Sequence, residues 1–145
     1  MGNFSKDFKT VENEVFCFIN YNNKEFIGKA ECHPDDQDFF SESTGKVIAE
    51  RRALIKYGKY VLAAEVRPQL KILRHLQASM KQSKSYNARS NEARLLRRQV
   101  AQLEKEEQMI KLDIACLFDS INDFIDAKDD FYKRIRAKRA EDKKD

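Results

Sequence analysis

The sequence predicts an α+β protein that is mostly α, in which a short N-terminal antiparallel β-hairpin precedes long helices that form an antiparallel, coiled-coil hairpin within an oligomer. Two observations predict this class. Asparagine-rich turn residues separate two β-prone runs near the N-terminus, and apolar residues recur every seven positions along the last third of the chain. The 145 residues suffice for a single domain, 1–145, with an elongated appendage.

Charge and cysteine content narrow the class further. The 28 basic and 24 acidic residues leave a formal net charge of +4 with the two signs interleaved, so we expect no nucleic-acid partner. The three cysteines lie far apart without a CxxC pair, which favours reduced thiols. With no apolar run long enough for a membrane span and no signal-peptide pattern, we expect a cytoplasmic protein without a membrane partner.

The N-terminal segment, 1–40, is expected to hold the hairpin and a turn. Residues 1–13 predict no fixed structure, whereas 15–19 and 25–32 are β-prone and flank the asparagine-rich turn 20–24. In the second run one face is formed by Phe26, Gly28, Ala30 and Cys32. Because two strands alone are marginal in water, the small residues on this face need a helix, or a strand of another chain, packed closely against them.

The segment after the hairpin contains metal-ligand side chains, namely Cys32, His33, Asp35 and Asp36. Zinc would need a second ligand pair at a defined spacing, so we interpret the segment as a capped turn and expect no metal. Ser43 and Thr44 are good N-caps for a helix that starts near Gly45. Together with Lys46 they resemble the end of a P-loop, but its leading glycine and magnesium-binding hydroxyl are missing.

Two helical segments follow. The first, 41–80, repeats apolar residues at Val47, Leu54 and Val61, and Pro68 should kink or break it because proline lacks an N–H and clashes with the preceding turn. A loop is expected at 81–91.

The last helix, 92–140, precedes a charged tail at 141–145. Its seam is formed by Leu96, Leu103, Ile110, Leu117, Phe124 and Phe131. At about 1.5 Å per residue this helix exceeds what the rest of the chain can cover, so we expect a homo-oligomer. Phe118, Ile125 and Tyr132 widen the apolar stripe where a further partner would pack.

Arginines near aromatic residues suit a nucleotide-like ligand, because a guanidinium pairs with phosphate and an aromatic ring stacks on a base. The alternative is that these arginines pair with acidic residues one helical turn away. No group of residues forms a catalytic constellation, and His75 has the apolar neighbours of a packed or surface histidine. We therefore expect no enzyme activity and no cofactor.

A motif spans residues 25–53: Phe26-x-Gly28-x-Ala30-x-Cys32-His33-Pro34-Asp35-Asp36, then Phe39 and Phe40, Gly45, and Ile48-Ala49-x-x-Arg52-Ala53. It resembles the first-described Thoeris anti-defence family of phage proteins. The resemblance implies an N-terminal hairpin, long C-terminal helices, and an oligomer that buries cyclic ADP-ribose isomers without cleaving them. Some members also hold cyclic oligonucleotides at a separate site between subunits.

The resemblance implies a cytoplasmic protein of the infected bacterial cell, a dimer at least and up to a hexamer. Arg52 would contact phosphate or another subunit, and Arg134 and Lys138 are candidates for the arginine-rich pocket. The expected ligand-binding set is Arg52, Tyr86, Arg89, Phe118, Asn122, Phe131, Arg134 and Lys138. The alternative function is a coiled-coil scaffold or adaptor of a phage that binds no small molecule.

Overall fold

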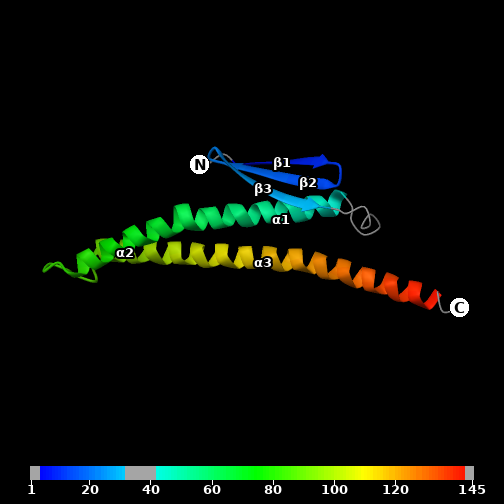
Figure 1. The fold of residues 1–145 in the computed structure, drawn as a ribbon. Helices are drawn as coiled ribbons and strands as arrows, with labels where there is room; N and C mark the ends of the chain where they lie inside the picture. The colour runs from blue at the N-terminus through cyan, green and yellow to red at the C-terminus, as the bar shows by residue number, and fades with distance from the viewer. Residues whose placement is uncertain (1–3, 32–41, 143–145) are drawn as a thin grey trace. The chain divides into compact units, whose positions relative to one another are not determined.

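The computed structural model describes residues 4–31 and 42–142, which are mostly helical after an N-terminal antiparallel sheet (Figure 1). Its elements are β1 (Phe4–Val11), β2 (Glu14–Tyr21), β3 (Lys24–Glu31), α1 (Glu42–Val61), the π-helical turn η2 (Leu62–Val66), α2 (Arg67–Lys81) and α3 (Asn91–Asp142). The mostly helical α+β class is confirmed. The metal-ligand candidates from Cys32 to Asp36, and Phe39 and Phe40 of the motif, lie outside the described residues.

The chain divides into two compact units. One comprises Met1–Tyr57 and Ala115–Asp145, and the other is Gly58–Ile114. The first unit therefore contains the sheet, most of α1 and the C-terminal part of α3. The second contains η2, α2 and the N-terminal part of α3.

The sheet has three strands in the order β1-β2-β3, so the prediction that residues 1–13 have no fixed structure is wrong. β1 pairs with β2 along its whole length. Its inward positions include two polar residues that bind α1: Lys6 Nζ lies 2.9 Å from Glu50 Oε1, and Thr10 Oγ1 donates a hydrogen bond to Glu42 Oε1 at 3.0 Å. These polar residues interrupt the apolar alternation that normally marks a strand.

The predicted asparagine turn between β2 and β3 is confirmed. Asn22 and Asn23 have φ angles of 49° and 66°, the left-handed backbone that a tight two-residue hairpin turn requires. Glu12, in the turn between β1 and β2, also has a positive φ of 54°. Glutamate is uncommon at such a position, which is why the sequence gives little sign of this first turn.

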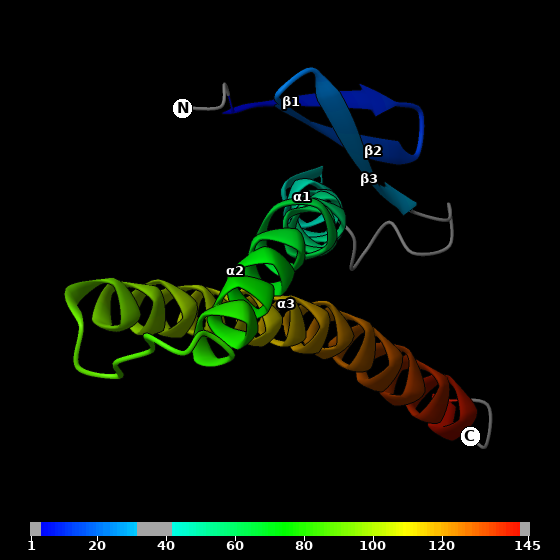
Figure 2. The ribbon, with the colours of Figure 1, turned by 90° about the vertical axis from the view of Figure 1, so that its left-hand side faces the viewer.

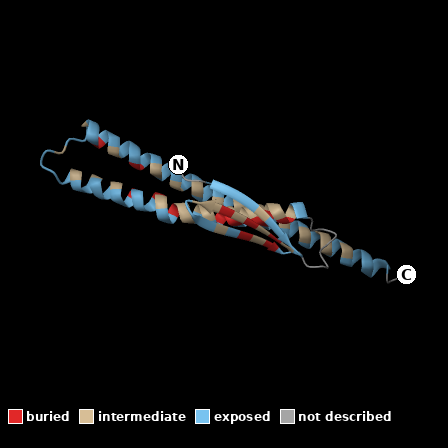
Figure 3. Ribbon diagram, turned by 90° about the horizontal axis from the view of Figure 1, so that it is seen from above, coloured by how far each residue is buried: buried red, intermediate tan, exposed pale blue. Residues whose placement is uncertain are grey.

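One face of the sheet packs on α1, as the small residues of β3 predict (Figures 1 and 2). A methyl group on Gly28 would collide with the Ala49 carbonyl oxygen and lie 2.5 Å from the Ala53 amide nitrogen. Cys17 and Ile19 of β2 are fully buried in the same layer. Figure 3 shows buried positions in the strands and at intervals along the helices.

The exposed edge of β3 is closed by two cations from α1. Arg52 Nη1 donates a hydrogen bond to the Lys29 carbonyl oxygen, and Lys56 Nζ donates one to the Ile27 carbonyl oxygen, both at 2.6 Å. Free carbonyl groups on an edge strand invite pairing with another chain. These two side chains, one helical turn apart, occupy the carbonyls and disfavour such pairing.

The start of α1 differs from the prediction. α1 already includes Glu42, so Ser43 and Thr44 lie inside its first turn and are not N-caps of a helix beginning near Gly45. Glu42 places a carboxylate in the first turn, where the positive end of the helix dipole favours it.

Pro68 does not end the helix. The chain stays helical from Glu42 to Lys81, and the disturbance takes the form of η2, in which the Arg67 N–H donates to the Leu62 carbonyl oxygen. A hydrogen bond that reaches back five residues widens the turn just before the proline. Pro68 then falls in the first turn of α2, where a missing N–H is tolerated.

In the second unit α2 and α3 pack antiparallel around a small apolar core. Val66, Leu70 and Val100 are buried there, with Leu73 and Leu103 packed against them. Arg74 Nη2 lies 3.2 Å from Glu104 Oε1 across the pair. Ser90 caps the start of α3, because its hydroxyl accepts a hydrogen bond from the Ala93 N–H at 3.2 Å.

No helix among residues 4–31 and 42–142 has the length and apolar character of a membrane span.

Candidate anion-binding site

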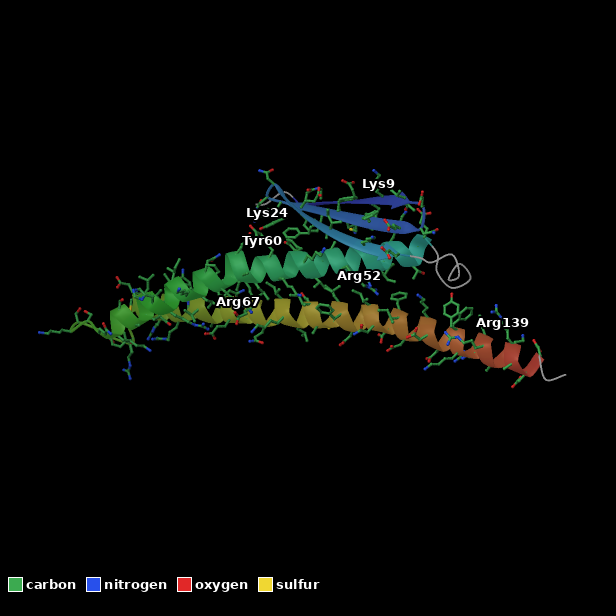
Figure 4. The ribbon with its side chains drawn as sticks, viewed as in Figure 1. Lys9, Lys24, Arg52, Tyr60, Arg67 and Arg139 are labelled. Atoms are coloured by element: carbon green, nitrogen blue, oxygen red, sulfur yellow. The ribbon has the colours of Figure 1, made fainter. Side chains whose placement is uncertain are left out.

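A hollow of about 460 Å³ lies beside η2 in the second unit. Its apolar floor is formed by Leu62, Ala63 and Ile114, and its cations are Lys59, Arg67 and Lys111. Lys59 belongs to α1, Arg67 begins α2, and Lys111 comes from α3. Figure 4 shows Arg67 on α2. Three helical segments thus bring three positive side chains to one apolar surface.

The backbone around the hollow follows from the sequence. Pro68 requires a disturbance of the preceding turn, and the π turn supplies it directly at the floor residues. Gly58, one residue before Lys59, allows close approach of α3, since a methyl group there would lie 3.1 Å from Ile114 Cγ1. π turns occur often at functional sites.

Two of the three cations share a carboxylate. Arg67 Nε lies 3.5 Å from Glu107 Oε2, and Lys111 Nζ lies 3.6 Å from Glu107 Oε1. The Glu107 side chain is only 17% exposed, so it is held close to both cations. Arg67 and Lys111 against one carboxylate leave one excess positive charge beside the hollow.

This arrangement can bind an anion and cover an apolar group at the same time. A guanidinium and two ammonium groups can contact phosphate oxygens, while the aliphatic floor accepts a ring or methylene surface. The volume falls within the range of small-molecule pockets, roughly 300–1,000 Å³.

Six of the eight residues predicted to bind a ligand lie in the first unit. They are Arg52 on α1 and, on α3, Phe118, Asn122, Phe131, Arg134 and Lys138. On α3 this set extends over 20 residues, which is about 30 Å of helix, so one compact ligand cannot touch all of it. Arg134 and Lys138 are both exposed, one turn apart.

The other two predicted residues lie in the loop between α2 and α3. Tyr86 lines a smaller hollow of about 190 Å³, together with Lys81 and Arg97. The Arg89 N–H donates a hydrogen bond to Asn87 Oδ1 at 3.0 Å, which fixes the end of the loop. Tyr86 is the one member of the predicted set of eight that lines either this hollow or the hollow beside η2.

Arg51, the neighbour of Arg52, lies against α3. Its guanidinium carbon is 5.3 Å from the centroid of the Phe124 ring, a cation–π contact within the first unit. Its Nη1 atom is buried and has no hydrogen-bond partner among the described residues. The helix therefore directs the two adjacent arginines to different surfaces, Arg52 to β3 and Arg51 to Phe124.

The prediction from sequence missed Lys59, Arg67 and Lys111. These residues are far apart in the chain and no motif joins them, although Tyr60 follows Lys59 directly. The available signal was Pro68, which indicated that the helix is disturbed beside Arg67. Among residues 4–31 and 42–142, no three His, Cys, Asp or Glu side chains are grouped so that they could hold a metal ion.

Comparison of the chain with protein-family models, with curated proteins and with solved structures gives no match.

Proposed function

We propose that the protein is a non-catalytic phage anti-defence protein that binds a cyclic nucleotide immune signal, such as a cyclic ADP-ribose isomer, and holds it intact in the cytoplasm of the infected bacterial cell. The observation that carries the proposal is the convergence of Lys59, Arg67 and Lys111 on an apolar floor beside η2. The cations would hold the pyrophosphate, and the floor would cover part of the nucleoside. The motif over residues 25–53 points to the same class of ligand.

The proposal includes assembly of copies of the chain, a dimer at least and up to a hexamer. Two large apolar side chains on the C-terminal part of α3 favour it, since Phe118 is 44% exposed and Ile125 is 42% exposed. Phe131, Arg134 and Lys138 follow one another at helical spacing on the same stretch. A second ligand site between subunits would use these residues.

Ligand release is the direct test. The protein is incubated with a cyclic ADP-ribose isomer, separated from free ligand, and heated, and the released nucleotide is identified by chromatography. Intact ligand is expected in near-stoichiometric amount. Recovery of a hydrolysed product would indicate an enzyme, and recovery of no nucleotide would contradict binding.

Paired substitutions locate the site. Arg67→Gln with Lys111→Gln should weaken ligand binding about 10- to 100-fold, because charge-assisted hydrogen bonds to phosphate are lost. Lys105→Gln with Lys133→Gln removes the same charge from exposed positions of α3 and should leave affinity unchanged. Loss of binding in Arg134→Gln with Lys138→Gln, but not in the first pair, would move the site to the C-terminal part of α3.

A scaffold or adaptor without a small ligand is the second candidate, and the exposed apolar residues of α3 favour it as well. Thermal unfolding separates the two. A ligand at a hundredfold excess over its Kd adds about 2.7 kcal/mol to the stability of the folded state. A scaffold would show no such shift with a nucleotide and would instead be stabilised by a partner helix.

A further inference from the structure

The charge of the chain is concentrated in one segment. Between Val66 and Leu103 there are nine basic residues and one acidic residue, Glu92, a net charge of +8. The remainder of the chain therefore carries a net charge of −4, so the chain-wide +4 is the sum of this positive segment and two weakly negative flanking segments. A total of +4 with interleaved signs gives no reason to expect nucleic-acid binding, whereas +8 on 38 residues does.

The structure places much of this charge on one face of the helix pair in the second unit. On α2 the spacing of Arg67, Lys71, Arg74 and Lys81 puts all four side chains on one stripe. The stripe runs beside the buried Leu70, which lies three residues after Arg67 and four residues before Arg74. Over 14 residues it is about 21 Å long.

α3 contributes to the same face. Arg74 pairs with Glu104, which shows that the stripe borders this flank of α3. At the loop end Lys81 and Arg97 line one hollow, and at the η2 end Arg67 and Lys111 line another. Two carboxylates, Glu104 and Glu107, lie among these cations. Because the cations outnumber them, the face keeps a net positive charge.

We infer that this cationic face binds the phosphate backbone of a nucleic acid, independently of base sequence. A stripe of about 21 Å lies alongside roughly six phosphates of one strand at 3.4 Å spacing. The side chains are long, exposed cations. They do not form a rigid array of donors and acceptors that would match the edges of particular bases, so they contact phosphate groups and do not recognise a base sequence. This inference goes beyond the proposed function and does not rest on it.

The test uses a quadruple variant that leaves Arg67 and Lys111 in place: Lys71→Gln, Arg74→Gln, Lys81→Gln and Arg97→Gln. Glutamine keeps helix propensity close to that of lysine and arginine, and circular dichroism checks the fold. The matched control is Lys9→Gln, Lys133→Gln, Arg136→Gln and Arg139→Gln, which removes four charges outside residues 58–114.

Binding to a labelled 20-nucleotide single strand and to a 20-base-pair duplex is measured by fluorescence anisotropy between 50 and 200 mM salt. For the wild-type chain we expect a log–log salt slope of about −4, hence an affinity loss of about 250-fold over this range. The quadruple variant should lose at least 10-fold in affinity at 50 mM salt, with a slope about 2 to 3 smaller in magnitude. The control variant should keep most of the wild-type affinity and most of the wild-type salt slope. Comparison of the two affinities shows whether the cationic face prefers the single strand or the duplex.

Two results would overturn the inference: no binding by the wild-type chain at 50 mM salt, or equal losses of affinity in the two quadruple variants. Failure here is distinguishable from failure of the proposed function. The quadruple variant retains the hollow beside η2, so its binding of a cyclic ADP-ribose isomer should be unchanged.

Discussion

At the scale of single residues, the environment of Cys17 has a measurable consequence. Cys17 on β2 is fully buried, and burial, followed by the nearby charge of Glu50, raises the pKa of its thiol above the ordinary value of 9.0. In the unfolded chain the thiol ionises near its ordinary pKa, whereas in the folded chain it stays protonated. The free energy of unfolding therefore falls as the pH rises above about 9.

We predict that Cys17→Ala flattens this pH dependence. Between pH 8 and pH 10.5 one linked proton contributes a slope of at most about 1.4 kcal/mol per pH unit, which urea unfolding under reducing conditions can measure. Cys116→Ala, at an exposed position of α3, is the control and should keep the wild-type slope. Equal slopes in all three proteins would show that Cys17 is not the titrating group.

Lys29 acts in the same direction at higher pH. Hydrogen bonds from its ammonium group to Glu31, and then to Glu14, raise its pKa above 10.5. A raised lysine pKa stabilises the fold below the unfolded value, and this contribution is lost as the pH rises through the folded value. The two groups are separable, because the Cys17 effect begins at lower pH.

At the scale of elements, the contact between β3 and α1 depends on the absence of a side chain at Gly28. The neighbouring atoms are backbone atoms of Ala49 and Ala53, which cannot move without displacing the helix. We predict that Gly28→Ala lowers the free energy of unfolding by about 1–3 kcal/mol, measured by urea denaturation.

Gly58→Ala is the matched control for this substitution. Its new methyl group would meet side-chain atoms and no backbone: two carbons of Ile114 at 3.1 and 3.2 Å, and Ile110 Cγ2 at 3.8 Å. The gain in helix propensity offsets the crowding, so the change should stay within about 1 kcal/mol. A Gly28→Ala protein as stable as Gly58→Ala would mean that the sheet does not pack on α1 as described.

The elements differ in how far the sequence specifies them. The turn at Asn22 and Asn23 and the small face of β3 were predictable, because backbone conformation and side-chain size leave a direct mark on residue type. β1 was not, since its inward Lys6 and Thr10 are satisfied by residues of α1 more than 30 positions away. Pro68 indicated a disturbed helix, but whether the chain kinks, breaks or forms a π turn depends on the packing around it.

At the scale of the whole molecule, the candidate site was the part that sequence reasoning reached least. Lys59, Arg67 and Lys111 are separated by up to 52 positions and meet only when α2 folds back against α3. The positive face was hidden for a different reason, because the total charge of +4 conceals a segment of +8. Arg134 and Lys138 of α3 remain candidates for a site that forms between subunits.

Sedimentation velocity of the protein with a cyclic ADP-ribose isomer, followed at 260 nm, tests ligand binding and self-assembly in a single experiment. The chain has no tryptophan and five tyrosines, so absorbance at this wavelength comes mainly from the nucleotide. We predict that the nucleotide sediments with a protein species of at least twice the 17.0 kDa chain mass. A nucleotide boundary that stays behind, with the protein sedimenting as a folded monomer, would contradict both binding and assembly.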